Sequence, residues 1–176
     1  MLARLLMLVA LAGGGTLAQD APAWTDWSVE APSPDWRTWV DADAGLALRL
    51  PPNHALAPAG DGLWYLHGHH GGDPTVPDAT LRWLPGASLE AALAETFATE
   101  AIAEPWRFGD DATRGLRVVA RGVGPDGTPY TQAGYLIEGE GGVLRLSRYE
   151  SFDWAPFHAV ASSLRWVRVV DGGVSE

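Results

Sequence analysis

Apolar residues alternate with other residues along several short segments, and this pattern predicts β-strands. The clearest case is the segment "LALRL", where Leu46, Leu48 and Leu50 alternate with Ala47 and Arg49 before two prolines. A period of two places one set of side chains on a single face of a strand, and proline ends the ladder because it has no N–H to donate. Similar reasoning predicts further strands at 36–41, 62–68, 78–85, 115–122, 128–140, 141–151 and 164–170.

Gly-rich turns separate the three strands predicted between 115 and 151. "GPDGTP" joins the first pair and "GEGG" the second. Glycine supplies the positive φ that tight hairpin turns need. The sequence therefore predicts an antiparallel meander in this part of the chain.

Two segments change from strand to helical spacing. In 88–104, Leu89, Leu93 and Phe97 recur at i, i+4 and i+8, which is the apolar stripe of an amphipathic helix. A second helix is predicted for 152–166, where apolar residues again follow a helical period.

The order of these elements resembles the PsbP-like fold. The resemblance rests on the strand "GLALRLPPNH", the helix that begins "SLEAAL", three consecutive strands and the closing segment "FHAVASSLRW". It implies an α+β fold in which helices pack on an antiparallel β-sheet, as an α/β/α sandwich. It also implies little about activity, because PsbP-like proteins bind different partners and mostly are not enzymes.

The first 20 residues have the parts of a secretory leader. Arg4 supplies the positive charge, an apolar run follows, and Ala18 is the small residue before the expected cleavage point. We expect a protein that is secreted or periplasmic, with no membrane anchor after cleavage. The expected division is a signal peptide (1–18), a flexible N-terminal arm (19–35), a single PsbP-like α+β domain (36–170) and a tail (171–176).

Composition narrows the classes of partner. The chain has 22 acidic residues against 12 basic ones, all of them arginine, for a net charge of −10 at pH 7. Such a charge repels nucleic acid and anionic membrane surfaces. The absence of cysteine excludes disulfides, thiol catalysis and lipidation at a leader cysteine.

Three of the five histidines lie within "HGHHGGD". In an extended strand two of them would share a face, and imidazoles at that spacing can bind zinc, copper or nickel. A polar hairpin loop would use the same residues without any chemistry, so both interpretations stay open. The proposed ligands are His67, His69, His70 and Asp73, with Asp78 or His54 as further candidates.

The sequence contains no assembled catalytic motif. It has no Gly-x-Ser-x-Gly elbow, and a set such as Ser151, Asp153 and His158 can be picked from almost any chain. His158 is more simply a boundary residue of the second helix. We therefore expect no enzyme activity and no cofactor.

Arginines stand beside aromatic residues on two predicted strands. Arg82 precedes Trp83, and "RLSRY" brings together Arg145, Arg148 and Tyr149. Such a face could receive an acidic or aromatic partner.

The leading hypothesis is an exported, non-enzymatic binding or accessory protein of the cell envelope, whose partner is an envelope protein or a small ligand. The alternative is a metal-binding envelope protein that uses His67, His69 and His70. A third possibility is a hydrolase of envelope sugars.

Overall fold

The computed structural model describes residues 32–68, 77–96, 100–108, 113–149, 154–170 and 173–175. The expected signal peptide and most of the expected N-terminal arm therefore lie outside the described residues. Part of the expected tail is described, because Gly173–Ser175 (β12) pairs antiparallel with Arg168–Val170 (β11).

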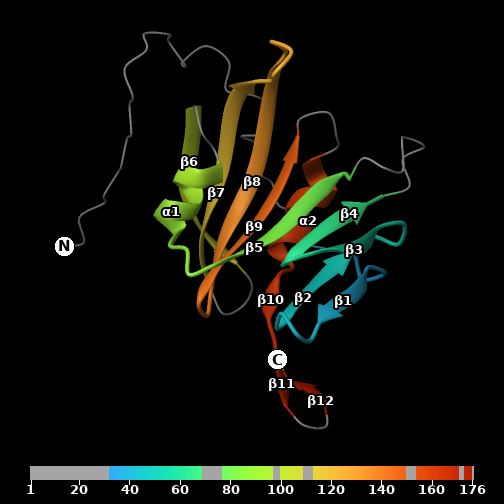
Figure 1. Ribbon diagram of the computed structural model, residues 1–176. Helices are drawn as coiled ribbons and strands as arrows, with labels where there is room; N and C mark the ends of the chain where they lie inside the picture. Colours follow the sequence, from blue (N-terminus) through green and yellow to red (C-terminus); the bar gives the residue numbers. More distant parts are fainter. Residues whose placement is uncertain are drawn as a thin grey trace, which may run out of the picture.

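A seven-stranded antiparallel sheet forms the body of the molecule (Figure 1). Its central three strands are β5, β9 and β8; β8 and β9 are consecutive, whereas β5 comes from a distant part of the chain. Because β7, β8 and β9 pair in sequence order, the predicted meander is confirmed. In sheet order the strands are β3 (Ala55–Gly60), β4 (Leu63–His67), β5 (Ala79–Pro85), β9 (Gly142–Tyr149), β8 (Pro129–Gly139), β7 (Thr113–Val123) and β6 (Glu100–Phe108).

A smaller sheet and a helix cover one face of this large sheet. The small sheet is ordered β1 (Arg37–Asp41), β2 (Leu46–Leu50) and β10 (Arg165–Trp166), and the helix is α2 (Trp154–Ser162). Ser163, just after α2, ties the two together, because its Oγ accepts from the backbone N–H of Arg49 at 2.8 Å.

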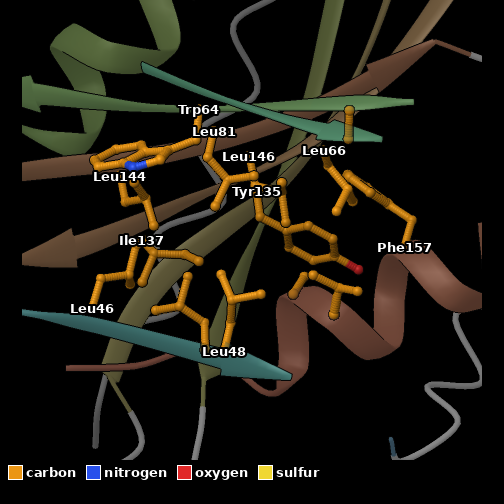
Figure 2. Packing of buried hydrophobic residues seen from close by; sticks show 14 of the residues in the cluster. Leu46, Leu48, Trp64, Leu66, Leu81, Tyr135, Ile137, Leu144, Leu146 and Phe157 are labelled. Atoms are coloured by element: carbon orange, nitrogen blue, oxygen red, sulfur yellow. The ribbon is translucent and has the colours of Figure 1, made fainter. Parts of the chain in front are cut away.

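The main core lies between these layers. Figure 2 shows leucines of β2 pointing toward Tyr135 and Ile137 of β8, toward Leu144 and Leu146 of β9, and toward Phe157 of α2. The β2 side chains in this core are Leu46, Leu48 and Leu50, the residues that the alternation at 46–50 places on one face. Burial of this kind contributes about 25 cal/mol per Å² of apolar surface.

The other face of the large sheet carries a second, smaller core under α1 (Leu89–Thr96). Leu89 and Ala92 of the helix pack on Leu136 of β8 and Val143 of β9. Figure 1 shows α1 beside β6, β7 and β8, away from α2 and the small sheet. Within the described residues, no helix has the length and apolar character needed to cross a membrane.

The predicted α+β fold, an antiparallel sheet packed by helices as an α/β/α sandwich, is wrong. The fold is β-rich: the helices have only 8 and 9 residues, and strands make up most of the described residues. The physical reason is that a second sheet, and not a layer of helices, supplies much of the apolar surface that covers the large sheet.

The predicted helix 88–104 accounts for much of the error, because α1 ends at Thr96 and β6 begins at Glu100. Pairing with β7 overrides the helical pattern. Arg117 of β7 lies opposite Glu104, donates to its carboxylate from Nε at 2.8 Å, and places its guanidinium 4.7 Å from the ring centre of Trp106.

Both edge strands of the large sheet contain a proline. Pro58 lies in β3, next to an irregularity in its pairing with β4, and Pro105 lies in β6. Proline has no N–H, so each edge lacks a donor that a further strand would need.

Candidate functional site

Polar side chains gather on the α1 side of the large sheet, on three neighbouring strands beside the helix. The register places Tyr65 opposite Thr80 and Thr80 opposite Ser147, and in the next row places Arg82 opposite Arg145. Leu84 and Val143 form the next row on the same face and pack toward α1. The polar side chains therefore lie on the α1 side of the sheet. We call this set the polar face: Tyr65, His67, Thr80, Arg82, Arg145 and Ser147.

Arg82 and Arg145 form the most unusual pair on the polar face. They lie directly opposite each other on adjacent strands, Arg82 exposed and Arg145 half-buried. Like charges directly opposite each other in a sheet are destabilising. The strands β4, β5 and β9 contain no aspartate or glutamate, and Arg145 instead contacts the end of α1.

Arg145 also contacts the end of α1. Its Nη1 donates to Oγ1 of Thr96, the last residue of the helix, at 3.3 Å. The C-terminal end of a helix carries partial negative charge and favours a nearby cation. This contact holds one of the two guanidiniums in place.

Hydroxyl groups and aromatic rings complete the polar face. The hydroxyls of Thr80 and Ser147 are hydrogen-bonded at 2.9 Å, and Ser147 is only 3% exposed. On β4 the rings of Tyr65 and His67 meet edge to face, with centroids 6.2 Å apart. The face therefore combines cationic donors, hydroxyls and an aromatic surface.

The structure places only part of the proposed metal site. His67 lies at the end of β4, whereas His69, His70 and Asp73 lie outside the described residues. Of the two further candidates, Asp78 accepts a hydrogen bond from the backbone N–H of Gly68 at 2.5 Å, which orders the chain next to β5. Among the residues that the structure describes, no group of three or more potential ligands could hold a metal ion. The metal site stays a prediction.

His158 of α2 belongs to the core. It is 3% exposed, and its Nδ1 is hydrogen-bonded to the hydroxyl of Tyr135 at 2.5 Å. Burial, with Arg148 and Arg117 nearby, lowers the pKa of His158 to about 4, and burial raises the pKa of Tyr135. Both side chains are therefore neutral at pH 7, and the pair supports α2 from inside the fold.

Sequence reasoning missed Tyr65, Thr80 and Ser147 as members of a common face. Thr80 and Arg82 stand at i and i+2, and so do Arg145 and Ser147. That spacing was a usable signal, because residues two apart on a strand share a face. The pairing of β5 with β9 was the missing information.

The comparisons with known proteins give little beyond the geometry. No family model matches the chain, and no curated protein matches it. Among solved structures, it is similar to a crystal structure of a protein from Bacteroides thetaiotaomicron VPI-5482, with 13% identity and a TM-score of 0.49 over 74% of this chain. The chain spans about half of that protein, 48% of its length. The resemblance to PsbP-like proteins stays a prediction.

Proposed function

We propose that this protein is an exported, non-enzymatic binding or accessory protein of the cell envelope, and that the polar face binds its partner. The leader-like first residues motivate export, and the polar face supplies a surface with specific chemistry. The expected partner is anionic, because two guanidiniums share one row of the face.

The proposal rests on the position of Arg82 directly opposite Arg145 on the neighbouring strand. Guanidinium groups bind carboxylates and phosphates through paired hydrogen bonds. Arg82 is exposed on this row, so a bound anion would meet its guanidinium directly. The chain is acidic overall, with a net charge of −10, so a row of two arginines stands out against its composition.

Binding, and not catalysis, fits the placement of the titratable groups. Burial lowers the pKa of His158 to about 4, and its side chain is sealed between α2 and β8. A group that solvent does not reach cannot exchange protons with a substrate. On the polar face the arginines keep their charge, which suits a permanent anion site.

Charge reversal at Arg82 tests the proposal. The mature chain, Arg82→Glu and Arg121→Glu would each be immobilised, and the retention of components from a bacterial envelope extract compared. Arg121 is also exposed and lies on β7, outside the polar face, so its reversal matches the change in net charge. We expect Arg82→Glu to lose retained components that Arg121→Glu keeps. Equal retention by all three proteins would remove the polar face from the function.

Export has a separate test. Expressed with its full leader in a bacterium, the protein should be recovered from the periplasm or medium, and mass spectrometry should find Gln19 as its first residue. Recovery from the cytoplasm with residues 1–18 intact would contradict export.

A further inference from the structure

We propose that the outer edge of β1 pairs with β1 of a second copy of the chain, in an antiparallel arrangement centred on Trp39. The small sheet that contains β1 covers the face of the large sheet opposite α1, so this surface is separate from the polar face. The inference therefore goes beyond the proposed function and does not depend on it.

The strand β1 is an edge strand without a proline. It pairs with β2 on one side, and within the described residues no strand pairs with its other side (Figure 1). The edges of the large sheet, β3 and β6, each contain a proline, and β10, the opposite edge of the small sheet, has only two residues. An unpaired edge of sufficient length accepts a further strand. The strand β1 is therefore suited to recruit one.

Contacts of β2 show which backbone groups of β1 point outward. The N–H of Arg49 donates to Oγ of Ser163 at 2.8 Å, and Ala47 pairs with β10. Both residues of β2 therefore direct their backbone groups away from β1. Their partners on β1 are Thr38 and Val40, which form the pairs of the ladder without hydrogen bonds. The backbone N–H and C=O groups of these two β1 residues face the outer edge.

Two β1 strands that meet antiparallel about Trp39 use these backbone groups. Thr38 lies opposite the second copy's Val40, and each such pair can exchange two hydrogen bonds. The arrangement is symmetric, so the same pair occurs on both sides of a two-fold axis. Val40, which is 40% exposed, gains a β-branched neighbour across the strands.

The charges of β1 are complementary in the same register. Arg37 lies opposite the second copy's Asp41, so the dimer contains two pairs of opposite charge. In the single chain the guanidinium of Arg37 donates to the carbonyl of His54, and Asp41 accepts from Nε1 of Trp64 at 3.1 Å and from the N–H of Ala44 at 2.9 Å. A guanidinium has five N–H donors and a carboxylate about four lone-pair sites, so both groups have capacity for a further partner. A register shifted by two residues would separate the opposite charges.

Sedimentation velocity of the mature chain between about 1 μM and about 1 mM tests the inference. We expect a monomer–dimer equilibrium, because two strands of five residues form a small interface. NMR of the isotope-labelled chain locates the interface: the amide signals of Thr38 and Val40 should shift with concentration, whereas that of Arg82 should not. A chain that stays monomeric at about 1 mM overturns the proposal. A dimer whose concentration-dependent shifts lie outside β1 overturns it as well.

A proline at the outer edge should block the pairing. Val40→Pro should weaken the dimer at least about tenfold, because each copy loses an outward donor while the ladder with β2 keeps its hydrogen bonds. Val40→Thr is the matched control, since it keeps the N–H and a β-branched side chain, and it should dimerise like the parent protein. Thermal unfolding of both variants verifies that they are folded.

Charge reversal tests the register. Arg37→Glu places two carboxylates opposite each other in each half of the interface and should weaken the dimer at least about tenfold at low salt, and less at high salt. Arg121→Glu, on β7 of the large sheet, makes the same change in net charge and should dimerise like the parent protein. Because Arg37 is exposed, this variant decides the outcome if Val40→Pro does not fold. Dimerisation of Arg37→Glu as tight as that of the parent protein overturns the proposed pairing.

Discussion

The two faces of the seven-stranded sheet use the same strands for different purposes. On β9, Leu146 is fully buried under α2, while its neighbours Arg145 and Ser147 belong to the polar face. On β5, Leu81 is fully buried and Arg82 is exposed. Because a shift of register by one residue would exchange the two sets, the apolar face fixes the position of the polar one.

The largest expected effect comes from a substitution that would create a cavity on the apolar face. Leu146→Ala should lower the free energy of unfolding by about 2–5 kcal/mol, because Leu146 is fully buried in the main core. Urea denaturation of the mature chain measures this, with Arg82→Gln as the polar-face control, expected to change stability by less than about 1 kcal/mol. A loss below about 1 kcal/mol for Leu146→Ala would show that the core is not continuous there.

Acid should lower the stability of the apolar face through His158. Its pKa is lowered to about 4 in the folded protein from an ordinary value near 6.5, so the unfolded chain takes up a proton first as pH falls. The contribution of His158 to the free energy of unfolding is therefore fully present above about pH 6.5. It is lost as the pH falls from about 6.5 to about 4, by up to about 3 kcal/mol.

Urea unfolding at a series of pH values measures this loss. His158→Asn should flatten the dependence between pH 6.5 and 4 relative to the parent protein. A pH dependence that is identical in the parent protein and His158→Asn would contradict the burial of a neutral histidine.

Close packing on the apolar face also depends on a glycine. A Cβ on Gly115 would lie 2.4 Å from the ring of Phe108 and 2.4 Å from the carbonyl oxygen of Leu136, which is part of the backbone. Gly115→Ala should therefore cost about 1–3 kcal/mol by overpacking. Thermal unfolding measures it, and a change below about 0.5 kcal/mol would show that the ring of Phe108 does not lie against β7.

The smallest effect has the opposite sign. Arg82→Glu replaces a repulsion across the strands by an attraction to Arg145, so it should raise stability by about 0.2–1 kcal/mol while abolishing binding. The gain should shrink in high salt. A loss of stability in Arg82→Glu would mean that the two arginines do not repel each other.

Alternation predicted the strands whose apolar face is well marked. The leucines at 46–50 and the meander from 115 to 151 are local signals, and the structure confirms both. The strand β3 has the sequence "ALAPAG", which lacks β-branched and aromatic residues, and only its pairing with β4 makes it a strand. In β6, the segment "EAIAE" favours a helix by composition, and pairing with β7 decides against it.

The polar face could be predicted only in part. The arginines on two strands were visible in the sequence. The suggestion that they receive an acidic or aromatic partner stays a prediction. Arg82 lies opposite Arg145 because of the register between β5 and β9. Along the chain, α1 and three further strands lie between β5 and β9. No local pattern encodes such a register. The contact of His158 with Tyr135 is non-local in the same way.

The prolines of the two edge strands have a consequence for association between copies of the protein. A molecule with so much strand is a potential template for fibrils, since any exposed margin can recruit another chain. Pro58 and Pro105 leave each margin short of one donor, at opposite ends of the sheet. A strand added at either edge of the seven-stranded sheet would therefore meet a proline, which disfavours side-to-side growth of that sheet.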